Sequence, residues 1–428
     1  MNIAIFEEAA VEKLAPITTS KPAYAIQCGG FRLVDLVDLL ETKVIAVVRP
    51  HLQQIQDRDF AFAAHLDTTQ PKTLVLNSQI APTVPNYQKI KELALADDCV
   101  VFGHDGHNDQ ADGGNEMNGN TKIIAAVLPT ELLAGEAWSK NLPSIIDAAN
   151  LTSAGTTLDT FEYPHDVVRF HMQHCEQNLE FRLLQNHFGR LADGVFVSKK
   201  SPPAIDPSAV FDSSSGPIIF DANVKVGPHC FFRGPVYIGE NCKISEHSSI
   251  KDSVSIAHTC KIGGEVEGCV MEPWTNKQHH GFLGHSYLGS WINLGAGTCN
   301  SDLKNTYGKI NMIYGDQTVA TDMQFVGCIM GDYAKTSINT SIFTGKTIGV
   351  ASMVYGLATA NVPSFVNYAR TLGQLGLLPP EIAIATQKRM FARRNVDHQT
   401  IDSQLIHDMF MLTDSERPSG LSPQPIAF

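Results

Sequence analysis

Histidine, lysine and glycine residues gather in one stretch of the sequence, from residue 275 to residue 305. His279 and His280 are adjacent, Lys277 precedes them, and a Gly-Ala-Gly turn follows Asn293 and Leu294. Histidine can serve as a neutral base near pH 7, and the N–H groups of a glycine-rich turn can stabilise an oxyanion. Lysine can hold a phosphate. The stretch is therefore the best candidate for chemistry in the sequence.

The same stretch interrupts a pattern that repeats every six residues. Aliphatic or small residues recur in three runs: Ile238, Ile244, Ile250, Ile256 and Ile262; then Phe282, Leu288 and Leu294; then Met330, Thr336, Ile342, Ile348 and Val354. A helix repeats at 3.6 residues and a simple strand at two, so neither explains the spacing. A period of six is typical of a parallel β-helix, in which inward residues of successive coils stack on one another.

The rest of the chain predicts an α/β layer before the β-helix and helices after it. Strands are expected at 2–6, 43–50, 73–78, 99–103 and 122–129, and short helices at 33–41 and 87–96. This alternation indicates a mainly parallel sheet. Residues 131–193 are expected to be mostly helical. The predicted domains are 1–197, the linker and start of the β-helix at 198–217, the β-helix at 218–362, and a helical segment with a tail at 363–428.

Composition and charge exclude several classes of protein. The net charge of −12 argues against a nucleic-acid binder, and no apolar run reaches the length of about 18 residues that a membrane span needs. The first residues lack the pattern of a signal peptide. Nine cysteines without a C-x-x-C pair indicate reduced thiols and a cytoplasmic protein.

A polar loop at 104–121 contains His104, Asp105, His107, Asp109 and Asp112. These side chains could hold a cation, but their spacing matches no defined metal loop. We therefore expect a solvated loop and predict no metal site.

The α/β head followed by hexapeptide repeats resembles the GlmU-type bifunctional sugar nucleotidyltransferase/acetyltransferase family. The stretch NKQHHGFLGHSYLGSWINLGAGTCNSDLKNTYG is also similar to a divergent bacterial branch of sugar nucleotidyltransferases. The resemblance implies a nucleotidyltransferase-like, Rossmann-like head and a left-handed β-helix. It also implies a cytoplasmic enzyme of sugar-nucleotide biosynthesis that acts on a sugar phosphate, a nucleoside triphosphate and acetyl-CoA.

Matching the acyltransferase motifs to this chain assigns roles to eight residues. The catalytic base falls on His279, with His280 as the second choice. Arg233, Lys277 and Asn293 match acceptor-binding positions, and Ala296, Asn300 and Ser301 match acetyl-CoA-binding positions. Phe282 stands where the family has a tyrosine, so one hydrogen bond to the acceptor is missing.

The head departs further from its family. EEAAVEK replaces the glycine-rich loop that cradles phosphates in the family. Lys21, Gly29, Gly30 and Arg32 are the substitute phosphate-binding residues, and Asn77 stands near the metal-binding aspartate of the family. Asparagine is a poor sole ligand for Mg²⁺. Two interpretations of the head therefore stay open. It could catalyse nucleotidyl transfer with Mg²⁺, or it could only bind a sugar nucleotide or pack against the β-helix.

Two other interpretations use the same β-helix. Hydratases resembling γ-carbonic anhydrases bind zinc through an H-x4-H pair, and His280 and His285 have that spacing, with His258 as a third ligand. A non-catalytic assembly scaffold is the other alternative. The resemblance to hexapeptide β-helix families implies a homotrimer, in line with the closed symmetry of most oligomers.

Overall fold

The computed structural model describes residues 1–104, 121–135 and 138–424. The predicted polar loop at 104–121, with its candidate cation ligands, therefore lies almost entirely outside the described residues. The chain divides into two compact units. The first comprises Met1–Leu14, Lys21–Ile26 and Phe31–Tyr163, and the second comprises Ala15–Ser20, Gln27–Gly30 and Pro164–Phe428. The chain thus alternates between the two units several times before residue 164, after which it belongs to the second unit alone.

The first unit is built on a six-stranded sheet with the order β2-β1-β3-β5-β4-β6. Its strands are β1 (Asn2–Phe6), β2 (Val44–Val47), β3 (Lys72–Asn77), β4 (Cys99–His104), β5 (Thr121–Pro129) and β6 (Thr152–Ser153). Strand β1 is parallel to β2 and β3, and β4 is parallel to β6. Strand β5 runs antiparallel to both of its neighbours. The sheet is therefore mixed, with the parallel part at β1, β2 and β3.

Helices pack against this sheet, and β1 and β3 are buried along almost their whole length. The helical elements are η1 (Ala9–Leu14), η2 (Ala23–Ala25), α1 (Leu33–Asp38), η3 (Pro50–Leu52), α2 (Gln53–Asp59), α3 (Val84–Ala94), η4 (Thr130–Leu133) and α4 (Trp138–Ala149). Trp138, Leu142 and Ile146 of α4 bury their side chains against one face of the sheet. Ile3, Ala4 and Ile5 of β1 are all fully buried, as expected for a strand covered on both faces.

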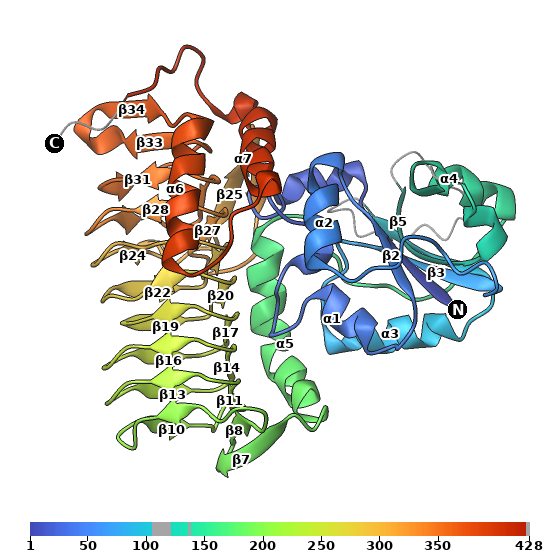
Figure 1. Cartoon of the computed structure of the whole chain (residues 1–428), viewed down its shortest axis with the longest axis horizontal. Coiled ribbons are helices and arrows are strands. Elements are labelled where there is room, and N and C mark those ends of the chain that lie inside the picture. The colour runs from blue at the N-terminus through green and yellow to red at the C-terminus, as the bar shows by residue number, and fades with distance from the viewer. Residues whose placement is uncertain (105–120, 136–137, 425–428) are drawn as a thin grey trace. The chain divides into compact units, whose positions relative to one another are not determined.

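The second unit is a solenoid of short parallel strands with three faces (Figure 1). One face carries β7 (Phe188–Ala192), β8 (Val195–Ser198), β11 (Ile218–Phe220), β14 (Val236–Ile238), β17 (Val254–Ile256), β20 (Val270–Met271), β23 (Tyr287–Leu288), β27 (Cys328–Met330) and β30 (Lys346–Ile348). A second carries β10 (Val210–Asp212), β13 (Phe231–Arg233), β16 (Ser249–Lys251), β19 (Glu265–Glu267) and β22 (Phe282–Gly284), and further along β24 (Cys299–Asn300), β29 (Ser341–Ile342) and β32 (Leu357–Ala358).

The third face completes each coil. It carries β9 (Ala204–Ile205), β12 (Lys225–Val226), β15 (Lys243–Ile244), β18 (Lys261–Ile262), β21 (Asn276–Lys277), β28 (Lys335–Thr336), β31 (Met353–Val354), β33 (Val366–Ala369) and β34 (Gln374–Leu377). Strands β9 and β10 lie within 198–217, the segment expected to hold the linker and the start of the β-helix. Strand β33 pairs in parallel with β31, so the solenoid also extends past residue 362.

The six-residue period identifies most of the inward side chains, but the spacing changes where a coil is shorter. Ile238, Ile244, Ile250, Ile256 and Ile262 are all buried in the core of the solenoid. Ile244 pairs with Ile262, eighteen residues on, but Ile262 pairs with Lys277, fifteen on. The shorter coil shifts the phase, so Leu283 and not Phe282 points inward, where it pairs with Val266. The expectation for Phe282 is therefore corrected.

Three helices and one hairpin accompany the coils of the second unit. Helix α5 (His165–Leu183) packs Cys175 and Leu179 against Ile219 and Tyr237, which explains why it groups with the second unit although the first domain was expected to reach 197. Helices α6 (Pro380–Arg393) and α7 (Thr400–Leu412) follow the last coils, with η5 (Arg370–Leu372) before them and η6 (Asp414–Glu416) after them. The hairpin of β25 (Asn311–Tyr314) and β26 (Gln317–Ala320) leaves one coil. No helix of the described residues combines the length and the apolar character that a membrane crossing requires.

Two early pieces of the chain are also bound into the second unit. The backbone N–H of Gln27 donates to the Glu272 carboxylate at 3.0 Å, and the Ser20 hydroxyl donates to Asp332 at 2.6 Å. Glu272 also accepts a hydrogen bond from Tyr287 at 2.8 Å. Both carboxylates are buried. Buried acids are costly without partners, so the pieces 15–20 and 27–30 stabilise this face of the solenoid.

Candidate functional site

The histidines of the central stretch lie at a corner of the solenoid, between β21 and β22. His279 and His280 are both exposed, and they line a surface hollow of about 470 Å³. Lys243 and His247, which lie two coils earlier, and Gln278 line the same hollow. The fold therefore places two candidate bases and a cation around one open space.

His280 is the histidine that contacts the Gly-Ala-Gly turn. Its carbonyl oxygen accepts a hydrogen bond from the N–H of Gly297 at 3.1 Å. A methyl group built on Gly297 would lie 3.4 Å from Nε2 of His280 and 2.1 Å from Oδ1 of Asn339. The turn at Gly297 has a φ of +76°, so glycine is needed there both for the backbone and for the close approach. The structure thus brings His280 and Ala296 together as neighbours of one turn.

The turn offers fewer free N–H groups than its sequence indicates. The N–H of Gly295 donates to the carbonyl of Thr336 and that of Gly297 to the carbonyl of His280. Ala296 is the one of the three whose N–H has no acceptor among the described contacts. An oxyanion could therefore be stabilised by one N–H of this turn rather than by several.

Lys277 points into the solenoid, which corrects the expectation that it binds the acceptor phosphate. The side chain takes the inward position above Ile262 and is only 2% exposed. Its ammonium group donates to the carbonyl oxygens of Gly263 at 2.6 Å and His279 at 2.9 Å. Burial lowers the pKa of Lys277 from 10.5 to about 8. Lys277 therefore stabilises the corner that carries the histidines.

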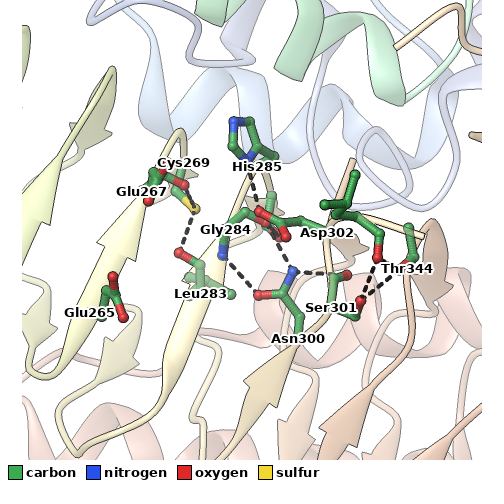
Figure 2. A network of polar contacts seen from close by, with 12 residues as sticks. Glu265, Glu267, Cys269, Leu283, Gly284, His285, Asn300, Ser301, Asp302 and Thr344 are labelled. Atoms are coloured by element: carbon green, nitrogen blue, oxygen red, sulfur yellow. Dashed lines mark hydrogen bonds and ion pairs between the residues drawn. The ribbon is translucent and has the colours of Figure 1, made fainter. Parts of the chain in front are cut away.

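Asn300 is also an inward residue, which corrects its expected contact with acetyl-CoA. Its Oδ1 accepts from the N–H of Gly284 at 2.8 Å, and its Nδ2 donates to the carbonyl of Gly284 at 2.9 Å (Figure 2). These bonds join successive coils. Ser301, by contrast, is exposed and accepts a hydrogen bond from the Thr344 hydroxyl at 2.8 Å.

The remaining acceptor-binding candidates lie on other parts of the solenoid. Arg233 forms an ion pair with Asp252 at the end of β13. Asn293 is exposed on the face that carries β21 and lies 3.4 Å from Asn276. One chain therefore does not gather Arg233, Asn293 and the histidines into a single site.

Gly29 and Gly30, which were expected in the head but belong to the second unit, do not form a phosphate cradle. The N–H of Gly29 donates to His171 at 3.0 Å, and the carbonyl of Gly30 accepts from Arg182 at 2.5 Å. The side chains of Asn178 and Leu179 fill the space beside both glycines. Their positive φ angles serve close packing against α5, and this corrects the phosphate-binding role expected for them.

The other candidates of the head have local partners. Arg32 pairs with Asp35 at 2.6 Å at the start of α1, and the carbonyl of Lys21 accepts from Arg49. Asn77 is fully buried and donates to Glu8 at 2.6 Å and to the carbonyl of Ile123 at 3.1 Å. Asn77 therefore supports the end of β3 and is not placed as a ligand for a metal ion.

A different set of residues surrounds the hollow at the carboxyl ends of β1 and β2. This hollow, of about 410 Å³, is lined among others by Glu7, Glu8, Glu12, Arg49 and Lys140. Arg49 and Glu7 form a largely buried ion pair at 3.0 Å. We did not predict these residues. The signal was the run EEAAVEK directly after the first strand, which we had interpreted only as the loss of a glycine-rich loop.

The histidines of the hydratase interpretation do not converge within one chain. His258, His280 and His285 lie at three different corners, because a strand or more separates each from the next. Nδ1 of His285 contacts Asp302 at 2.8 Å, as Figure 2 shows. No group of three or more metal-binding side chains occurs in the part of the chain that the structure describes.

Comparison with known proteins supports the assignment of the head. Residues 3–186 match the model of the sugar nucleotidyl transferase family. A bifunctional sugar-1-phosphate nucleotidylyltransferase/acetyltransferase of Sulfurisphaera tokodaii is 25% identical over 97 residues, which cover 23% of this chain and 24% of that protein. These matches point to a transferase.

Two solved structures are similar to the chain. One is a Bacillus cereus protein assigned as an acetyltransferase, with 13% identity and a TM-score of 0.21, covering 49% of this chain and 94% of that one. The other is the UDP-N-acetylglucosamine acyltransferase of Francisella novicida, with 14% identity and a TM-score of 0.23, covering 52% of this chain and 93% of that one. The solenoid fold itself is established by the strand pairing described above.

Proposed function

We propose that the protein is a sugar-nucleotide transferase whose head transfers a nucleotidyl group from a nucleoside triphosphate to a sugar 1-phosphate. The observation that carries this proposal is the match of residues 3–186 to the sugar nucleotidyl transferase family. The hollow beside Glu7 and Glu8 supports it. This hollow lies at the carboxyl end of β1, and β1 stands between β2 and β3 in the sheet, so the strand order reverses at this point. Ligands of α/β sheets bind outside the carboxyl ends of strands where the order reverses.

The charges around this hollow suit a triphosphate with Mg²⁺. Mg²⁺ is commonly held by one or two carboxylates together with substrate phosphates. Glu8 and Glu12 are the candidates here: Glu7 is paired with the cation Arg49, whereas Glu8 accepts a hydrogen bond from the neutral amide of Asn77. Bound Mg²⁺ would neutralise phosphate charge during transfer. Lys140 is exposed at the rim and would contact a phosphate directly.

Pyrophosphate release from mixtures of nucleoside triphosphates and sugar 1-phosphates tests the proposal. Lys140→Ala should raise KM at least several-fold with a smaller change in kcat, because it removes a binding contact. Lys91→Ala is the matched control, since Lys91 is exposed on α3, where its ammonium group lies over the ring of Tyr87, and it does not line the hollow. Absence of pyrophosphate with every pair of substrates would refute nucleotidyl transfer in the head.

A second activity, acyl transfer on the solenoid, is favoured by the position of His280 beside the Gly-Ala-Gly turn. The donor would be acetyl-CoA and the acceptor an amino-sugar phosphate. Since Lys277 is buried, Lys243 becomes the cation that would hold the acceptor phosphate in the hollow. Arg233, Asn293 and Ser301 could complete the site only from neighbouring copies of the chain in a homotrimer. Release of free thiol from acetyl-CoA in the presence of amino-sugar phosphates is the assay, and no release with any acceptor would exclude this activity.

A further inference from the structure

A column of basic side chains runs along the outer side of one solenoid face. Lys225, Lys243 and Lys261 lie in register on β12, β15 and β18. Asn276 and Asn293 continue the column, and Lys335 follows them. Like charges opposite one another on neighbouring strands are destabilising, so this arrangement costs stability unless something neutralises it.

Helix α6 brings two more cations to the same column. Phe391 near its end stacks on Trp291, with ring centroids 4.5 Å apart, and Trp291 stacks in turn on Trp274 at 4.8 Å. This packing holds Arg393 and Arg394 over the strands, where Arg394 donates to Oδ1 of Asn276. A hollow of about 220 Å³ remains between the helix and the strands, lined by Trp274, Asn293, Lys335, Arg393 and Arg394.

No acid balances these cations among the described ion pairs. Lys335 donates its described hydrogen bond to the carbonyl of Tyr333 at 2.8 Å. Burial and the neighbouring Arg394, Arg393 and Lys243 lower the pKa of Lys261, and burial lowers that of Lys335 to about 8. The whole chain carries a net charge of −12. A crowded group of cations in an acidic protein is therefore a local feature that favours an anion.

We propose that Lys335, Arg393 and Arg394 form a binding site for the phosphoryl group of a small phosphorylated molecule. Guanidinium groups bind phosphate oxygens through paired N–H donors, and Asn293 adds a neutral donor at the rim. The size of the hollow suits a phosphate or pyrophosphate group, with the rest of the ligand outside. The phosphoryl site lies on a face of the solenoid, whereas the histidine hollow lies at a corner. The proposal of a phosphoryl site does not depend on either proposed reaction.

Two of the three tryptophans of the chain line this hollow, which provides a direct signal of binding. Trp138 lies in the first unit, so a Trp138→Phe background leaves a fluorescence that comes from Trp274 and Trp291. Pyrophosphate is the first probe, titrated into the full-length protein at low salt. UDP and coenzyme A, in separate titrations, then distinguish a nucleoside diphosphate from a phosphorylated thiol cofactor as the source of the group.

We expect saturable quenching by pyrophosphate, weakened at least tenfold by Lys335→Gln and by Arg393→Gln, and weakened by added salt. Lys225→Gln is the matched control, since it lies in the same column but outside the hollow, and it should leave the dissociation constant unchanged. Circular dichroism of each variant checks that the fold is retained. The proposal is overturned if pyrophosphate, UDP and coenzyme A all fail to change the fluorescence, or if the control variant weakens binding as much as the other two.

Discussion

At the scale of single residues, the two adjacent histidines differ in what they touch. His280 lies beside Gly297, and its carbonyl is fixed by the N–H of that residue. His279 is exposed, and only its backbone carbonyl is engaged, by Lys277. The base of the proposed acyl transfer is therefore assigned to His280, where the resemblance alone favoured His279.

This assignment predicts unequal effects of two substitutions. His280→Ala should lower kcat for acetyl transfer by about 10²- to 10⁴-fold, because a positioned general base contributes that much. His279→Ala is the control and should stay within a few-fold of the unmodified protein. Thiol release from acetyl-CoA measures both, and the reverse order of effects would return the role to His279.

The buried ammonium group of Lys277 should make the free energy of unfolding depend on pH. Its pKa falls from 10.5 to about 8 on folding, so between these values the unfolded chain holds a proton that the folded chain has lost. The free energy of unfolding therefore rises with pH across that window and is lowest below pH 8. The rise should amount to a few kcal/mol at most, at about 1.4 kcal/mol per unit of pKa shift.

Urea unfolding at pH 7 and at pH 10 measures this rise. Lys277→Met should lose the contribution of Lys277, whereas Lys225→Met, at an exposed position of the same face, should keep it. Equal pH profiles for the unmodified protein and Lys277→Met would contradict the burial of the ammonium group.

At the scale of elements, the period of six was sufficient to predict the solenoid and most of its inward residues. It could not give the direction of Lys277, because the phase changes in a coil shortened to fifteen residues. Asn300 does keep the period, six residues after Leu294, but its polar side chain was assigned to ligand binding and not to an inward position. Gly29 and Gly30 were misassigned for a related reason. Glycine reports a backbone angle or a close approach, and only the structure reveals that α5, not a phosphate, lies against these two.

The attachment of α6 gives a prediction at this scale. Phe391 is buried and stacks on Trp291, so Phe391→Ala should reduce the free energy of unfolding by about 3–5 kcal/mol, the usual cost of removing a buried aromatic ring. Ile382→Ala on the same helix is the control, because Ile382 is half exposed, and should cost less than about 1 kcal/mol. Similar losses in the two variants would indicate that the helix is held by other contacts.

At the scale of the whole molecule, the match of the head to a nucleotidyltransferase family and the solenoid were both accessible from the sequence. The division of the chain into its two compact units could not be predicted from the sequence. Pieces 15–20 and 27–30 belong to the second unit through contacts with residues far away in the sequence, such as Ser20 with Asp332, 312 residues apart, and such contacts leave no periodic signal. The expected homotrimer stays a prediction, and a monomer mass in sedimentation equilibrium at micromolar concentration would refute it.

Removing the early pieces should weaken the solenoid. A chain of residues 164–428 lacks the N–H of Gln27 and the hydroxyl of Ser20, which leaves the buried Glu272 and Asp332 with fewer donors. An unpartnered buried polar group costs about 1–3 kcal/mol, so we expect a lower urea midpoint than that of the second unit in the full chain. Glu272→Gln and Asp332→Asn in the truncated chain should recover part of the loss, and an unchanged midpoint on truncation would contradict the stabilising role.

These long-range contacts also constrain how the protein is made. Residues 15–20 leave the ribosome early, but Asp332 follows more than 300 residues later, a delay of roughly 15–60 s at about 5–20 residues per second. During that time the Ser20 hydroxyl lacks the Asp332 carboxylate that accepts its hydrogen bond, while β1 already has β2 and β3 to pair with. The contact of residues 15–20 within the second unit is therefore completed only late in synthesis, once the chain has been made as far as Asp332.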